Sequence, residues 1–246
     1  MKVELVGTGA IYTKYNSACT LVNEELIIDM PNGTLKQLLK SNHKPEKIKA
    51  ILITHMHGDH IADIPFFLKH VFNYIKIDNE ITIIGPTGIE DKIVELFEAY
   101  RFEDREEIQE FMNIKFIELS EEEKQIEVEK YKINAIQVSH GAEKPAYGYT
   151  INNTISCTGD SGICENVEKL IENSKVTIAD TSLRKGDHCH MGIDNIKYLI
   201  EKYNKQIIAT HLRDTTREEL KKENNKNILV VEDGYQFEIW ENEKWN

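Results

Sequence analysis

Three histidines and an aspartate lie within six residues of one another, in the segment Thr54-His55-Met56-His57-Gly58-Asp59-His60. The segment follows the apolar run KAILIT, residues 49–54, which indicates a buried strand. In an extended chain the first two imidazoles point to the same side, and a bend at the glycine brings the aspartate and the third histidine beside them. Neutral imidazole and carboxylate groups suit zinc, manganese or iron. This one segment can therefore ligate two neighbouring metal ions.

Three other apolar runs each end in one further residue that could ligate a metal. These residues are His140 after residues 133–138, Asp160 after residues 154–157, and His211 after residues 205–210. Because α/β proteins carry their sites at the carboxyl ends of strands, we expect these side chains to meet the histidine-rich segment. Each alone is weak evidence, but together the four segments predict a centre for two ions.

Strand-like and helix-like segments alternate in the first and last thirds of the chain, while residues 114–138 favour strands. This pattern predicts an α/β fold of two sheets with helices outside them. Asn32 is expected to cap a helix over residues 34–41, and Asp233-Gly234 is expected to turn a closing β-hairpin. Since the candidate ligands run from His55 to His211 and no linker is visible, residues 1–246 are predicted to form a single domain.

The chain is acidic, with 42 Asp and Glu against 30 Lys and Arg and a net charge of −12. Such a surface repels phosphate backbones unless a local cation, such as a bound metal, reverses the field. No apolar run reaches the ~18 residues of a membrane helix, and the first residues resemble a strand more than a signal peptide. The four cysteines are then expected to be reduced thiols in a cytoplasmic protein without a membrane partner.

The motif His55-x-His57-x-Asp59-His60, followed in order by His140, Asp160 and His211, resembles that of the metallo-β-lactamase superfamily of metal-dependent hydrolases. The resemblance implies a four-layer αβ/βα sandwich with the site along one edge of two facing sheets. It also implies two divalent ions, with zinc expected and manganese or iron as alternatives. The implied ligands are His55, His57 and His140 for one ion and Asp59, His60 and His211 for the other, with Asp160 bridging both.

Further segments are similar to the ribonuclease Z branch of that superfamily, including Thr158-Gly159-Asp160-Ser161, Ala179-Asp180-Thr181-Ser182 and His188-Cys189-His190. By this resemblance His190, oriented by Asp180, is the general acid that assists the leaving group. His188 is its rival, because in an extended stretch the two rings would point the same way. The metal ligand Asp59 also counts among the expected catalytic residues.

One departure from ribonuclease Z bears on the substrate. That family carries a long arm that grips transfer RNA between its histidine and bridging-aspartate motifs, whereas here His140 and Asp160 are only 20 positions apart. The sequence therefore predicts a phosphodiesterase that uses a metal-bridging hydroxide on small or cyclic phosphodiesters, with structured RNA a less favoured substrate and a homodimer left open. The alternatives are a ribonuclease Z-like RNA endonuclease, a same-fold hydrolase of lactone, thioester or lactam bonds, and a non-catalytic metal-stabilised module.

Overall fold

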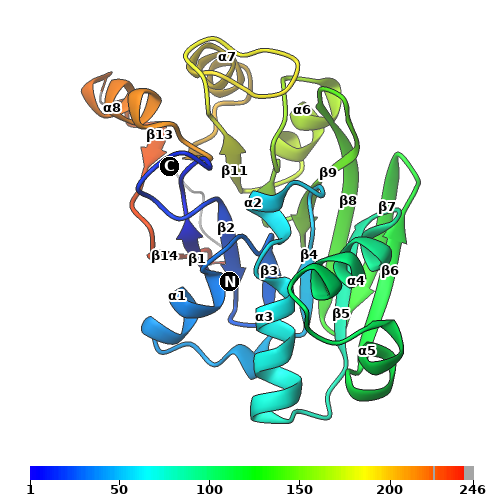
Figure 1. Cartoon of the computed structure of the whole chain (residues 1–246). Helices are drawn as coiled ribbons and strands as arrows, with labels where there is room; N and C mark the ends of the chain where they lie inside the picture. The colour runs from blue at the N-terminus through cyan, green and yellow to red at the C-terminus, as the bar shows by residue number, and fades with distance from the viewer. Residues whose placement is uncertain (224, 241–246) are drawn as a thin grey trace.

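The computed structural model, which describes residues 1–223 and 225–240, contains two seven-stranded sheets packed face to face (Figure 1). The first sheet has the strand order β14-β1-β2-β3-β4-β5-β6. Its strands are β1 (Lys2–Gly7), β2 (Cys19–Val22), β3 (Leu26–Ile28), β4 (Ala50–Leu52), β5 (Ile81–Pro86), β6 (Ile114–Leu119) and β14 (Tyr235–Glu238). Strands β3 to β6 run parallel, and the other pairings are antiparallel.

The second sheet has the order β13-β12-β11-β10-β9-β8-β7. Its strands are β7 (Glu123–Val128), β8 (Tyr131–His140), β9 (Glu143–Ile151), β10 (Ile155–Cys157), β11 (Val176–Asp180), β12 (Ile207–Thr210) and β13 (Ile228–Val230). Strands β10 to β13 run parallel, whereas β7 to β10 pair antiparallel. Each sheet thus has a parallel part, whose strand ends offer the positions at which α/β proteins place their sites.

Helices cover the outer face of each sheet. Those of the first half are α1 (Thr34–Lys40), the 3-10 turn η1 (Pro45–Lys47), α2 (Gly58–Ile61), α3 (Ile64–Leu68), the π-helix η2 (Lys69–Ile75), α4 (Ile89–Ala99) and α5 (Arg105–Phe111). Those of the second half are α6 (Glu165–Glu172), α7 (Ile193–Tyr203) and α8 (Asp214–Glu223). No helix in the described ranges is both long enough and apolar enough to cross a bilayer.

Three hydrophobic clusters join these layers. The central cluster contains side chains of both sheets, among them Leu5 and Leu52 from the first and Tyr149 and Ile178 from the second. A second cluster packs the first sheet against α1, α3 and α4, and a third packs the second sheet against α6, α7 and α8. Figure 1 shows α7 and α8 on one side of the molecule and α1, α3, α4 and α5 on the other. The predicted four-layer αβ/βα sandwich is confirmed.

The predicted helix cap at Asn32 is wrong. The residue that precedes α1 is Gly33, whose φ of 86° lies in the left-handed region, and no side chain caps the helix. The chain enters this helix through a conformation that glycine adopts at little cost, so a capping side chain at position 32 does not reach the first turn.

The predicted closing hairpin at Asp233-Gly234 is also wrong. Strand β13 pairs parallel with β12 in the second sheet, whereas β14 pairs antiparallel with β1 in the first. Both carboxylate oxygens of Asp233 accept hydrogen bonds from the loop after β1, at the backbone N–H groups of Thr8 and Asn16 and the Thr8 hydroxyl. These contacts tie the turn to the first sheet, so the chain crosses between sheets instead of folding back.

Candidate metal centre

The four segments predicted to carry ligands meet at one edge of the two sheets. The histidine-rich segment follows β4 of the first sheet and opens α2. His140 ends β8, Asp160 follows β10 and His211 follows β12, all in the second sheet. Because each strand ends at the same edge, residues far apart in the chain come within contact of one another there.

One group of three imidazoles converges from both sheets. His57 Nδ1 lies 3.0 Å from His55 Nε2 and 3.3 Å from His140 Nε2. Three nitrogen ligands around a tetrahedral zinc at its usual bond length would be about 3.3 Å apart. His55 and His140 are buried and His57 is half exposed, so this group opens on one side to solvent. These three residues could hold one metal ion.

Asp59, His60 and His211 form a second group beside the first. Oδ2 of Asp59 lies 3.5 Å from His211 Nε2 and 3.7 Å from His60 Nε2. These three ligand atoms lie within 4.8 Å of one another and could hold a second ion.

A single carboxylate oxygen lies between the two groups. Asp160 Oδ2 is 3.3 Å from the Nε2 atoms of both His60 and His211. The same oxygen is 3.8 Å from His55 Nε2 and 4.0 Å from His140 Nε2. Asp160 thus contacts two members of each group and has the position that a bridging ligand requires.

Hydrogen bonds behind two of the imidazoles fix which nitrogen faces the centre. Asp29 Oδ2 lies 2.7 Å from Nδ1 of His60 and accepts its hydrogen. The same carboxylate accepts from the hydroxyl of Thr54, whose oxygen lies 3.0 Å from His55 Nδ1 and can accept from it. Since each Nδ1 carries the hydrogen, each Nε2 presents a lone pair to the centre.

Two further contacts direct the Nε2 atoms of the second-sheet histidines, His140 and His211, toward the centre. His140 Nδ1 donates to the backbone carbonyl of Cys189 at 2.8 Å. His211 Nδ1 lies 2.7 Å from the hydroxyl of Ser182. The outer partners of four ligand candidates are therefore in place, as they are around structural and catalytic metal ions in general.

The unpaired atoms at the centre support a cation. Nε2 of His60 and Nε2 of His211 are buried and have no hydrogen-bond partner within the described part of the chain. A buried polar atom without a partner costs free energy, and both atoms point at the same carboxylate oxygen of Asp160. A divalent cation would be coordinated by these nitrogen lone pairs, so the residues present fit a dinuclear metal site.

The electrostatics of the site also favour positive charge. Burial lowers the pKa of His60 and His211, but the surrounding carboxylates, with Asp160 the strongest, together outweigh burial and raise the pKa of both. Burial would raise the pKa of Asp160, but His211 and His60 hold it well below the usual range. Burial also lowers the pKa of His55 and His140, which keeps both imidazoles neutral as metal ligands require. The carboxylates are thus ionised and attract a cation.

A sixth imidazole, that of His190, lies next to the five of these two groups. His190 Nδ1 donates to Asp180 Oδ2 at 2.8 Å, and its ring stacks on that of His211 with centroids 5.2 Å apart. Burial lowers the pKa of His190, but the hydrogen bond and charge of Asp180 raise it above the usual value. Asp180 is completely buried and accepts three more hydrogen bonds from Ser161 and Ser182. This carboxylate therefore holds the imidazole rigidly, with Nε2 toward the cavity that His190 lines.

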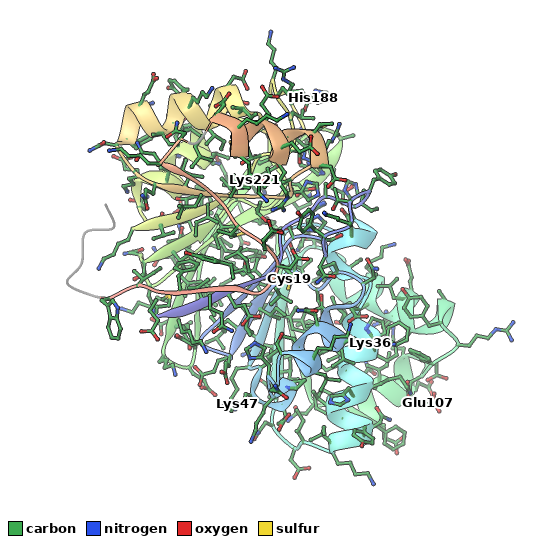
Figure 2. The ribbon with its side chains drawn as sticks, turned by 90° about the vertical axis from the view of Figure 1, so that its left-hand side faces the viewer. Cys19, Lys36, Lys47, Glu107, His188 and Lys221 are labelled. Atoms are coloured by element: carbon green, nitrogen blue, oxygen red, sulfur yellow. The ribbon has the colours of Figure 1, made fainter. Side chains whose placement is uncertain are left out.

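His188 is not brought to the same place. The chain bends at residues 188–190 instead of running extended, so the two histidines do not point the same way. His188 is exposed, is not among the residues that line the cavity, and lies at the upper margin of the molecule in Figure 2. Asp187 Oδ1 makes this bend by accepting the backbone N–H groups of Cys189 and His190. Of the two histidines, His190 lines the cavity and His188 does not.

The metal groups form one wall of a cavity of about 760 Å³. The loop after β1 supplies another wall, with Ile11 and Tyr12, and Arg213 lies at the start of α8. Tyr12 is 93% exposed although it borders the cavity. The cavity thus combines ligand candidates with apolar and cationic side chains, as small-molecule sites do.

Asp29 and Ser182 are site residues that sequence reasoning missed. Asp29 lies just after β3, 31 positions before its partner His60, and its φ of 60° is unusual for a residue other than glycine. Ser182 follows β11 and lies 29 positions before His211. The signal for Asp29 in the sequence is a polar residue just past an apolar run, which is too common to single it out. Ser182 lies in a segment similar to ribonuclease Z, but nothing in that segment assigned it a role.

Replacing Asp29 with asparagine is expected to weaken metal binding about 10- to 100-fold, the usual effect of losing an outer partner of a ligand. Asparagine preserves the shape and tolerates a positive φ, but it cannot hold the hydrogen of His60 as a carboxylate does. Competition with a chromophoric chelator measures the affinity, and far-ultraviolet circular dichroism checks that the variant folds. Unchanged affinity in a folded variant would contradict this role.

One family model matches nearly the whole chain. The sequence model of the family described as anti-Pycsar protein Apyc1 matches residues 1–237. A ribonuclease Z of Pediococcus pentosaceus is 34% identical over 165 residues, which are 61% of this chain and 49% of that protein. A ribonuclease Z of Ligilactobacillus salivarius is 32% identical over 166 residues, 61% of this chain and 48% of that protein. The chain matches about half the length of these curated relatives.

Solved structures share the fold over nearly the entire chain. A diphosphatase of the PhnP family has a TM-score of 0.78 at 19% identity, over 97% of this chain and 98% of that one. The human tRNase Z short form has a TM-score of 0.74 at 22% identity, over 97% and 99%. The metallo-β-lactamase fold protein YhfI of Bacillus subtilis has a TM-score of 0.75 at 18% identity, over 96% and 98%. These likenesses confirm the metallo-β-lactamase fold.

Proposed function

Because this chain belongs to the family described as anti-Pycsar protein Apyc1, we propose that it is a metal-dependent hydrolase of the metallo-β-lactamase fold that cleaves small or cyclic phosphodiesters. The position of Asp160 supports the proposal most directly. One of its carboxylate oxygens lies within 4.0 Å of four imidazoles from both groups, as a ligand shared by two metal ions would. Two bound divalent cations would supply an activated water and neutralise charge on the phosphate.

The first cation is assigned to His55, His57 and His140, and the second to Asp59, His60 and His211. These assignments follow the two converging groups, with Asp160 shared between them. Zinc suits the mixture of imidazole and carboxylate ligands, and manganese or iron would also be accepted.

His190 is assigned the role of general acid. Its Nδ1 is held by Asp180 at 2.8 Å, so a proton on Nε2 is directed into the cavity, where a leaving oxygen would lie. Protonation of that oxygen avoids release of an unstable alkoxide. Asp180 keeps the tautomer and orientation of the ring and stabilises its charged form.

We favour a small substrate because of the short turn between β8 and β9 and the net charge of the chain. Only Gly141 and Ala142 separate β8 from β9 beside the metal groups, so no arm extends from this hairpin to hold a folded RNA. The net charge of −12 also opposes a long polyanion. An RNA endonuclease is the second candidate, because curated relatives at 34% and 32% identity are named ribonuclease Z.

A substrate panel tests this choice. Protein loaded separately with zinc, manganese and iron is assayed on bis(p-nitrophenyl) phosphate, cyclic nucleotides, an oligoribonucleotide, a precursor transfer RNA, a lactone, a thioester and a lactam. We expect the small diesters to have kcat/KM values at least about tenfold above that of the transfer RNA. Cleavage of the RNA alone would favour the second candidate. Hydrolysis of only the lactone, the thioester or the lactam would overturn both the phosphodiesterase and the RNA endonuclease candidates.

We further propose that residues 1–246 work as one domain in the cytoplasm. The assigned ligands come from both sheets, so neither half of the chain would hold the site alone. All four cysteines are unpaired thiols, which is usual in a reducing compartment. Residues 241–246 of this domain lie outside the part that the structure describes.

A further inference from the structure

A carboxylate outside both metal groups faces the cavity next to them. Glu143 is the first residue of β9, and its backbone pairs with that of His140 across the short turn at Gly141. Its side chain lines the cavity and is 30% exposed. The pairing of β8 with β9 thus fixes the backbone of Glu143 beside a proposed metal ligand.

The oxygens of Glu143 are available to a ligand. Oε2 lies 3.8 Å from Nε2 of His57, which is longer than a hydrogen bond, and no residue of 1–223 or 225–240 donates a hydrogen bond to this carboxylate. Its neighbours Ser139 and His140, by contrast, both have hydrogen-bond partners. A carboxylate that accepts nothing from the protein while facing a cavity has free lone pairs for a donor on the substrate.

The charge of Glu143 restricts what that donor can be. An anionic group beside a site for an anionic phosphodiester costs binding energy through like-charge repulsion. A second phosphate near it would add to this cost. A neutral hydrogen-bond donor on the substrate, such as a hydroxyl group, would offset this cost.

The position of Glu143 says which part of the substrate it reaches. His57 directs Nδ1 to the first metal group and Nε2 to Glu143, so the carboxylate is one imidazole ring away from the ligand atoms. A diester bound at the metal groups would bring the atoms next to its ester oxygens into this part of the cavity, which Glu143 lines. In a nucleotide these atoms belong to the sugar, whereas the base extends beyond them.

Resting on the proposed function, we infer that Glu143 is a specificity-determining residue that accepts a hydrogen bond from a sugar hydroxyl adjacent to the scissile diester. The substrates it selects are ribose-containing phosphodiesters. Deoxyribose diesters leave the carboxylate unpaired beside the phosphate. Diesters without a sugar gain nothing from it.

The test compares 3′,5′-cyclic AMP, its 2′-deoxy counterpart and bis(p-nitrophenyl) phosphate as substrates of the metal-loaded full chain. Wild-type protein is expected to favour the ribose diester over the deoxy one roughly ten- to a hundredfold in kcat/KM, the range for one hydrogen bond to a charged acceptor. Glu143→Ala is expected to remove this preference, mainly through KM. Glu143→Gln, which keeps the size and an acceptor oxygen, is expected to retain part of it.

Activity on bis(p-nitrophenyl) phosphate and the metal content by elemental analysis serve as controls. In Glu143→Ala the metal content is expected to equal that of wild type, and the activity on bis(p-nitrophenyl) phosphate is expected not to fall, because this substrate offers the carboxylate no donor. Equal kcat/KM for the ribose and deoxyribose diesters in wild type would overturn the inference and leave the phosphodiesterase proposal intact. An equal loss on all three substrates would also overturn it, because Glu143 would then act through His57. Failure of wild type on every diester would overturn the proposed function and this inference with it.

Discussion

Asp160→Ala is expected to lose both metal ions and more than about a thousandfold of its activity on a small phosphodiester. Asp160 Oδ2 contacts His60 and His211 at 3.3 Å and His55 and His140 at 3.8 and 4.0 Å. Without this carboxylate, the five imidazoles and Asp59 would surround two cations with less negative charge to offset the repulsion between the cations. Elemental analysis after gel filtration gives the metal content, and the same samples give kcat.

Asp63→Ala is the matched control. Asp63, like Asp160, is a buried carboxylate; it accepts the backbone N–H of Leu35 and belongs to neither metal group. This variant is expected to lose some stability but to keep both ions. Two ions retained in a folded Asp160→Ala protein would refute the bridging role, and one retained ion would show that Asp160 serves a single group.

His190→Ala is expected to lower kcat by about 10²- to 10⁴-fold on a diester with an alkyl leaving group, the range for removal of a general acid. The loss on bis(p-nitrophenyl) phosphate should be much smaller, because its leaving group departs as a stabilised anion and needs no proton. KM should change little, since the proton is transferred in the transition state. The ratio of the two losses is the measurement that separates proton donation from a general structural effect.

His188→Ala provides the matched control, two positions away in the same bend. Because His188 is exposed and does not line the cavity, kcat on both substrates should stay within a few-fold of wild type. The assignment of the general acid would be wrong if His190→Ala had equal effects on both leaving groups. The general acid would instead be His188 if the loss of kcat in His188→Ala differed more between the two leaving groups than the loss in His190→Ala.

The metal-ligating residues could be predicted because their signal is local. Three imidazoles and a carboxylate directly follow one buried strand, and the remaining candidates each follow another. Parallel strands end at the same sheet edge, so a set of polar residues past strand ends converges whatever the details of packing. The structure brings all seven candidates together and leaves their role as ligands to the metal-binding experiments above.

The closing segment and the helix cap could not be predicted from local patterns. Asp233-Gly234 is a common hairpin signal, but here the carboxylate bonds to Thr8 and Asn16, more than 200 positions earlier. Gly33 rather than Asn32 precedes α1 because the chain enters the helix in a left-handed conformation. A contact far along the chain decided the closing segment, and the left-handed backbone of the adjacent Gly33 decided the start of the helix.

The sequence by itself determined the α/β class, the order of the ligand candidates and the chemistry of their side chains, since these depend on residue type and on the spacing of apolar runs. Only the tertiary structure decided that Asp160 lies between the two groups, that Asp29 and Ser182 support His60 and His211, and that His190 faces the cavity while His188 does not. The reason is physical. Side-chain positions at a sheet edge depend on strand pairing, on chain bends and on hydrogen bonds between residues such as Asp180 and His190 or Asp29 and His60, which belong to different segments of the chain.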